Sequence, residues 1–142
     1  MSDQSPQSWH RFRDAIVLST ELSRREEYQQ ALKMLDESIE EAVRENQTRW
    51  ITTLSHHAAV IADFSGNQEL VKHYYEQSLA HDCNNPRALY GLATIAREQG
   101  ELKTAREYAA RCQKAIVAAD DEVVKKGLIE LIAKHWPDIA ER

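Results

Sequence analysis

The sequence has few of the residues that interrupt regular structure, with 4 glycines and 3 prolines in 142 residues. This scarcity disfavours a β fold with many tight turns and favours long helices. Two cysteines, Cys83 and Cys112, are too few for a disulfide framework, and their spacing matches no metal or redox motif. No apolar run approaches the ~20 residues that a membrane helix requires. The first residues also lack the basic start and apolar core of a secretion signal. These absences predict a cytoplasmic protein that does not associate with a membrane.

An excess of basic residues is also missing. The chain has 18 Lys and Arg against 23 Asp and Glu, and its net charge is −5. A general nucleic-acid-binding protein needs a basic face to displace counterions, so we expect no nucleic acid among the partners. Hydrophobic residues at 42% and charged residues at 29% are typical of a folded globular chain. At this length we expect a single domain, 1–142.

Catalytic motifs are absent as well: there is no phosphate-binding glycine loop, nucleophile elbow or HExxH pattern. The pair His56-His57 is a candidate for metal binding. Neighbouring residues on a helix point about 100° apart, however, and the positions one turn later are Val60 and Ile61, which cannot act as ligands. The sequence therefore predicts a protein that is not an enzyme and has no cofactor and no metal.

What the sequence does contain is a series of amphipathic helical segments separated by short connections. Ser5-Pro6, Thr48, Asn67 and Asp120-Asp121 are predicted N-caps, and Gly66 and Gly100 are predicted stops. The seven apolar stripes begin at Trp9, Tyr28, Trp50, Leu70, Leu89, Leu102 and Val124. Because the connections are short, consecutive helices must pack as antiparallel neighbours.

Some of these segments repeat. Gly66 and Gly100 are 34 residues apart, and so are the pairs Val71/Ala105 and Ser78/Cys112. This period, together with the stretch 74–93, resembles the tetratricopeptide repeat (TPR) family. The resemblance implies an all-α, right-handed superhelix of antiparallel helix hairpins, a TPR-like α-solenoid of about seven helices. It places repeats at about 12–45, 52–85 and 86–119 and a capping helix at about 120–136.

The family pattern also assigns positions within each hairpin. It puts small side chains where the two helices of a hairpin cross most closely, at Ser19/Ala31, Ala59/Val71 and Ala93/Ala105. In the first repeat, which matches least well, the family positions fall on Ala15, Leu18, Ser19, Leu22, Ala31 and Leu35.

In this family the first helix of each hairpin lines a concave groove that binds a peptide or helix of another protein. The resemblance places groove positions on Arg13, Ile16, Thr20 and Arg24, on Thr53, His56, His57, Val60 and Asp63, and on Arg87, Tyr90, Thr94 and Arg97. Arginine and tyrosine are common at binding hot spots, so a mildly basic groove on an acidic protein is the functional hypothesis. Ordinary solvated helix faces are the alternative. Only Arg87 fits the subclass that grips the carboxylates of chaperone tails.

A protein-binding scaffold is thus the predicted function, with two alternatives. One is a self-assembling structural protein, a homodimer that packs through its end helices or through Trp9, Trp50 and Trp136. The other is a small-ligand binder or enzyme that uses the polar groove residues. The sequence does not name the partner.

Overall fold

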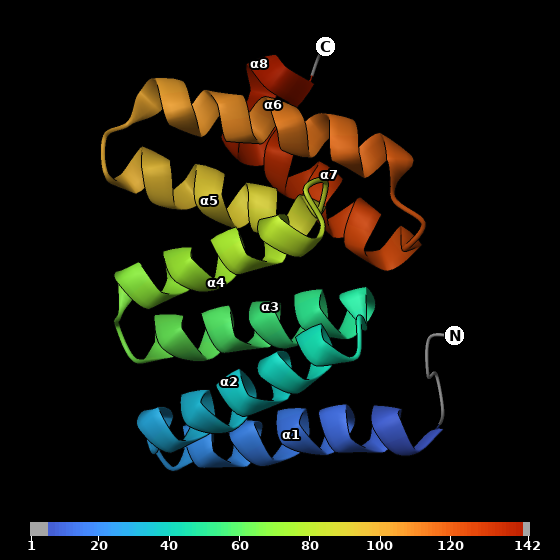
Figure 1. Ribbon diagram of the computed structural model, residues 1–142. Coiled ribbons are helices and arrows are strands. Elements are labelled where there is room, and N and C mark those ends of the chain that lie inside the picture. Colours follow the sequence, from blue (N-terminus) through green and yellow to red (C-terminus); the bar gives the residue numbers. More distant parts are fainter. Residues whose placement is uncertain (1–5, 141–142) are drawn as a thin grey trace. The chain divides into compact units, whose positions relative to one another are not determined.

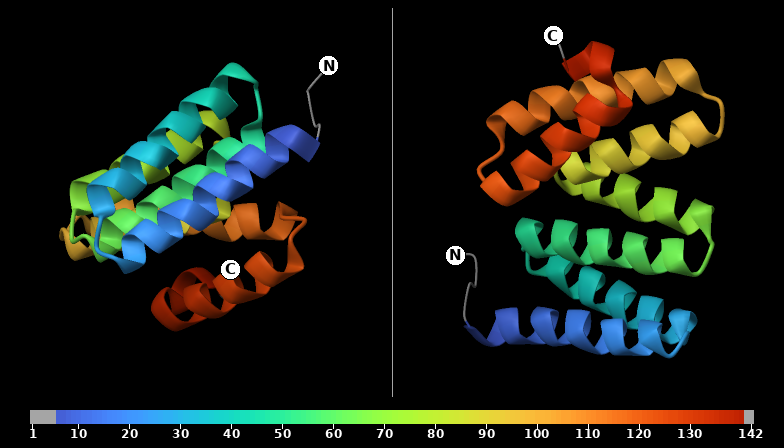
Figure 2. Two further views of the ribbon diagram at one scale, coloured as in Figure 1. Left: turned by 90° about the horizontal axis from the view of Figure 1, so that it is seen from below. Right: turned by 180° about the vertical axis from the view of Figure 1, so that it is seen from behind.

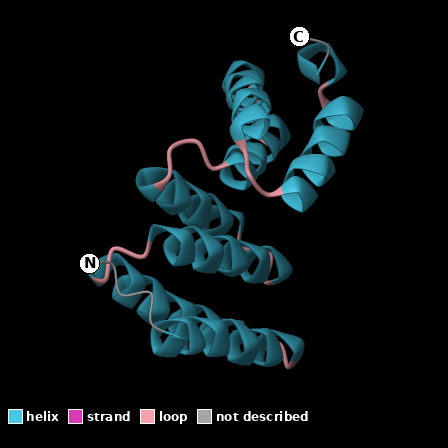
Figure 3. Cartoon of the chain, turned by 90° about the vertical axis from the view of Figure 1, so that its right-hand side faces the viewer, coloured by secondary structure: helices cyan, strands magenta, loops and turns pink. Residues whose placement is uncertain are grey.

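The computed structural model describes residues 6–140, and its regular elements in this range are all α-helices (Figure 3). Their bounds are α1 Pro6–Arg24, α2 Tyr28–Arg44, α3 Thr48–Phe64, α4 Gln68–His81, α5 Pro86–Glu98, α6 Leu102–Ala118, α7 Glu122–His135 and α8 Pro137–Ala140. The expected all-α class is confirmed. The seven expected helices are joined by a short eighth, because Pro137 ends α7 and then serves as the first helical residue of α8.

The chain forms two compact units, residues 1–81 and 82–142, and each is described by itself. In unit 1, α1 packs on α2, α2 on α3 and α3 on α4, and α1 also contacts α3 (Figure 1). Two reversals of direction separate α1 from α3, so these first helices of the two hairpins run the same way. Their exposed sides therefore belong to one surface.

Four turns share one geometry that fixes these reversals. Glu26, Asn46, Gly66 and Gly100 have positive φ values of 60°, 54°, 79° and 79°. In each turn the next residue donates its backbone N–H to a carbonyl five residues earlier, as in the bond from Asn67 to Ala62 at 3.0 Å. This is the Schellman pattern, which satisfies carbonyls left over at the end of a helix. The predicted stops at the two glycines are confirmed.

In unit 2, α5 and α6 form a hairpin, and α7 packs against both helices (Figure 2). The short α8 contacts α6 and α7. Side-chain caps start two of these helices: Asn85 Oδ1 accepts from the Ala88 N–H at 3.1 Å, and Asp121 Oδ1 accepts from the Val123 N–H at 3.0 Å. Helix α7 thus covers the open side of the last hairpin, as a terminal cap in a helical array must.

The predicted small-residue pairs are all buried: Ser19/Ala31, Ala59/Val71 and Ala93/Ala105. One family-pattern position is not buried: Leu18 is 53% exposed. The related residue of α5, Leu92, is only 2% exposed. The predicted cap Thr48 is wrong, since it is already the first residue of α3 and Gln47 holds the cap position. Ser5 lies outside the described residues.

No described helix has the length and apolar character needed to cross a bilayer. The division of the chain into three repeats and a cap within one domain stays a prediction.

Candidate functional site: the first-helix faces

The main candidate surface lies on α1 and α3 of unit 1. One row of residues recurs on each helix at intervals of four, three and four, which keeps every member on one side of its helix. We call these two rows the first-helix face of unit 1; its members are Arg13, Val17, Thr20 and Arg24 on α1, and Thr53, His57, Val60 and Phe64 on α3.

A hydrogen bond joins the two rows near their middle. Thr20 Oγ1 lies 3.0 Å from His57 Nε2 and 2.7 Å from the Ile16 backbone oxygen. A hydroxyl has one hydrogen, and a carbonyl oxygen can only accept, so the threonine donates to Ile16 and accepts from the histidine. The proton between them therefore lies on His57 Nε2, and the bond links α1 to α3.

Burial explains why this imidazole is neutral. His57 is half-buried, and desolvation lowers its pKa from the ordinary 6.5; a hydrogen bond to the Ile16 backbone oxygen opposes the shift. The centre of the face is thus uncharged at neutral pH. Its positive charge comes from the two arginines.

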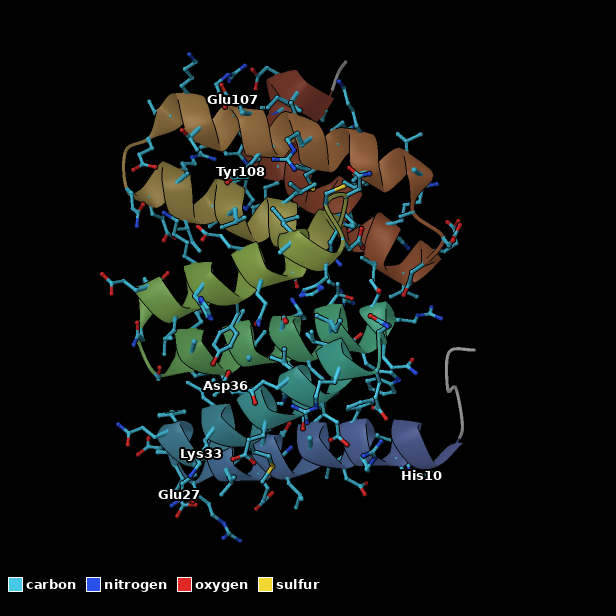
Figure 4. The ribbon with its side chains drawn as sticks, viewed as in Figure 1. His10, Glu27, Lys33, Asp36, Glu107 and Tyr108 are labelled. Atoms are coloured by element: carbon cyan, nitrogen blue, oxygen red, sulfur yellow. The ribbon has the colours of Figure 1, made fainter. Side chains whose placement is uncertain are left out.

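Arg13 and Arg24 lie toward the two ends of the α1 row, and both are exposed. Arg13 Nη2 donates to Nδ1 of His10, labelled in Figure 4, at 2.7 Å. Arg24 makes an ion pair of 3.6 Å with Glu21, with side-chain exposures of 75% and 52%. An ion pair this exposed contributes little, about 0–1 kcal/mol. The Arg24 guanidinium can therefore exchange this carboxylate for one on a partner.

Two apolar members of the face are unusually exposed, Val17 at 61% and Phe64 at 70%. Neither was among the predicted groove residues. The signal was present in the sequence, because Val17 and Phe64 stand in the same row positions as His57 and Arg24, 40 residues away. Exposed apolar side chains on a face that also carries charged ones are typical of binding surfaces.

Two predicted groove residues instead interact within their own hairpin. The His56 ring lies 6.2 Å from the ring of Tyr75 on α4. Asp63 accepts a hydrogen bond of 2.9 Å from Gln68 Nε2 across the turn between α3 and α4. His56 and His57 are neighbours in sequence, yet one contacts α4 and the other α1, as their 100° separation requires.

In unit 2, the predicted residues lie on or beside the exposed side of α5. Arg87 is exposed, Tyr90 and Thr94 are half-buried, and the Thr94 hydroxyl donates to the Tyr90 backbone oxygen at 3.1 Å. Burial raises the pKa of Tyr90, so its phenol stays protonated. Arg87 and Tyr90 therefore offer a charge and a hydrogen-bonding ring to solvent on one helix.

Arg97, another predicted groove residue, is engaged within unit 2. Its Nη1 donates to the His135 backbone oxygen at 2.9 Å, and its guanidinium lies 4.8 Å from the centre of the Trp136 ring. Trp136 itself is 6% exposed. The arginine thus satisfies a carbonyl at the end of α7 and fixes the cap helix to α5.

The other tryptophans are less informative about binding. Trp50 packs against Phe12 with ring centres 5.5 Å apart, joining the N-terminal ends of α3 and α1. The side chain of Trp9 lies outside those that the structure describes.

Charge is divided between the helices of unit 1. Helix α1 has three basic and two acidic residues, whereas α2 has two basic and four acidic ones. Lys33 and Asp36 are visible along α2 in Figure 4, and Asp36 accepts a hydrogen bond of 2.7 Å from the Tyr74 hydroxyl of α4. The positive part of unit 1 is therefore α1, although the unit as a whole is acidic.

Groups that could carry out chemistry are sparse. Within residues 6–140, no three His, Cys, Asp or Glu side chains come together as a metal site. Cys112 is fully buried and donates to the Pro86 backbone oxygen at 3.3 Å; burial raises the pKa of its thiol to about 12. Such a thiol acts as a small apolar group in the core. Cys83 is exposed.

A solved structure of another protein has a similar fold. The chain is similar to the type III secretion translocator chaperone SycD of Yersinia enterocolitica, with a TM-score of 0.65. The match has 15% sequence identity and covers 87% of this chain and 88% of that one. The likeness is one of fold, and it agrees with tandem antiparallel helix hairpins. No family model matches the sequence. No curated protein matches it.

Proposed function

We propose that this chain is a protein-binding module that holds a segment of another protein on the first-helix faces of its hairpins. The observation that carries the proposal is the face on α1 and α3, where arginines and highly exposed apolar side chains share one surface fixed by the Thr20–His57 hydrogen bond. The likeness to SycD supports it, because SycD is a translocator chaperone. Membership of the TPR family is part of this proposal and rests on the 34-residue period.

Site-specific photocrosslinking in the native cell tests the proposal. A photoreactive amino acid replaces Thr53, which is exposed on the first-helix face, and in a second variant it replaces Glu40, which is exposed on α2. We expect a crosslinked partner at position 53 and not at position 40. Equal crosslinking at both positions, or none at position 53, contradicts a partner site on this face.

The same experiment tests self-assembly. If the crosslinked species at position 53 is a second copy of this chain, the homodimer replaces the partner-binding module. A different protein in the crosslink excludes self-assembly as the use of this face.

A further inference from the structure

We infer that the first-helix face of unit 1 receives an amphipathic α-helix of its partner, with carboxylates at both ends of a short apolar stripe. The inference rests on the proposed function and adds the chemistry and conformation of the bound segment. It follows from the charges, the exposed apolar groups and the spacing of the face.

Charge sets the sign of the partner. Arg13 and Arg24 are the charged members of the face, and both are exposed. Arginine matches a carboxylate through two parallel N–H donors, which a neutral partner cannot use fully. The rest of unit 1 is acidic, with a two-residue excess of acid on α2 alone, so it repels an acidic segment that lands elsewhere. A partner helix bearing carboxylates is therefore directed to α1.

Apolar contact supplies the centre. Val17 on α1 is 61% exposed, and Val60 in the α3 row is half-buried; Phe64, which is 70% exposed, extends the apolar surface at the end of the α3 row. At the middle of the face, Thr20 and His57 already satisfy one another. Apolar groups of a partner can therefore cover these two side chains without breaking the hydrogen bond between them. The centre suits aliphatic or aromatic side chains of a partner.

The spacing of the two arginines matches that of a helical partner. Arg13 and Arg24 are eleven residues apart on α1, which corresponds to about 16 Å along the axis. A partner helix spans this distance with carboxylates eleven residues apart. The residues four and seven positions after the first carboxylate lie on the same side of that helix as the carboxylates. A helix with this spacing therefore presents both acids and the apolar stripe on one side.

Binding of designed helices to the full chain tests this, measured by fluorescence anisotropy at low and at physiological salt. The probe is a synthetic helix with glutamates eleven residues apart and leucines at the two positions between them that share their face. One control peptide has lysines in place of the glutamates, and another has its leucines moved to the opposite side. We expect the glutamate helix to bind about tenfold more tightly than either control at low salt, with less preference at physiological salt.

Protein variants locate the effect. R13E with R24E should reverse the preference between the glutamate and lysine peptides. The matched control, K33E with R44E, makes the same charge change at exposed positions of α2 and should leave the preference intact. Phe64→Ser removes a side chain that is 70% exposed and should weaken binding of the glutamate helix with little effect on folding.

Equal binding of the glutamate and lysine helices, or equal losses in the two double variants, overturns the inference. So does the absence of measurable binding by the glutamate helix. A partner that crosslinks at position 53 through an extended or basic segment refutes the inference while the proposed function stands. Loss of that crosslink refutes the proposed function itself.

Discussion

His57 is a half-buried titratable residue that links α1 to α3 on the first-helix face. It donates from Nε2 to Thr20, and this bond spans 37 residues of sequence. Protonation would place a cation in a half-buried position between α1 and α3. The histidine therefore links the stability of unit 1 to pH.

The direction of this linkage follows from the lowered pKa of His57. Between the unfolded value of 6.5 and the lower folded value, the unfolded chain binds the proton more readily. The contribution of neutral His57 is thus complete above about pH 6.5 and declines as the pH falls below it. We expect the thermal midpoint to decrease between pH 7.5 and pH 5.5, and to decrease less in His57→Gln, where the amide keeps a donor toward Thr20.

The matched control for this measurement is His73→Gln, because His73 is exposed on α4. It should show the same pH dependence as the unmodified protein. If His57→Gln and His73→Gln follow the same curve as the wild type, the neutral histidine does not contribute as described.

At the scale of elements, the turns between helices are alike although their residues differ. Gly66 and Gly100 occupy the left-handed position at φ 79°, whereas Glu26 occupies it at φ 60°. A side chain in this conformation costs roughly 1–2 kcal/mol, and glycine avoids that cost but loses more backbone entropy on folding. The turn between α1 and α2 is therefore a strained version of the turn between α3 and α4.

Glu26→Gly should stabilise the protein by about 0.5–1 kcal/mol, measured by urea unfolding. The reverse substitution, Gly66→Ala, should destabilise it by about 1 kcal/mol. A Cβ at Gly66 meets no atom within 4 Å, so the loss reports backbone conformation alone. A destabilised Glu26→Gly variant would show that this side chain stabilises the turn more than its conformation strains it.

One polar contact joins the end of the cap helix of unit 2 to α5. Arg97 of α5 binds the His135 carbonyl at 2.9 Å and stacks near Trp136. Arg97→Ala should therefore speed amide hydrogen exchange in residues 122–140 while amides in the middle of α5 and α6 keep their protection. Arg97→Lys retains the charge without the planar group, so it should protect the cap only partly. Unchanged exchange in Arg97→Ala would show that burial of Trp136 alone holds the cap.

At the scale of the whole molecule, the net charge belongs to one unit. Residues 1–81 contain 8 basic and 13 acidic side chains, whereas residues 82–142 contain 10 of each. The exposed apolar side chains are spread over several helices, among them Val17, Phe64, Leu102, Val117 and Val123. Stable homodimers instead bury large, core-like apolar surfaces.

We therefore expect a monomer whose mass, measured by light scattering, does not change with protein concentration. A comparison at low and at physiological salt controls for charge repulsion, which salt screens. A mass that doubles with concentration at both salt levels would favour the self-assembling alternative.

The sequence by itself determined the helices, because each signal for them is local. Apolar spacing gave every long helix, and Asn67 and Asp121 cap or start their helices as predicted. The resemblance to the TPR pattern also placed the small residues of the hairpin crossings, all of which are buried.

Only the tertiary structure decided which exposed residues remain available to a partner. Helical spacing places both Arg97 and Phe64 in the outer row of a first helix. In the structure, however, Arg97 binds the end of α7, whereas Phe64 is left 70% exposed. Leu18 fits the family pattern but is left 53% exposed. Helical periodicity shows on which side of a helix a residue lies. Whether its side chain is exposed to a partner depends on what packs against that side, often from residues more than 30 positions away in the sequence.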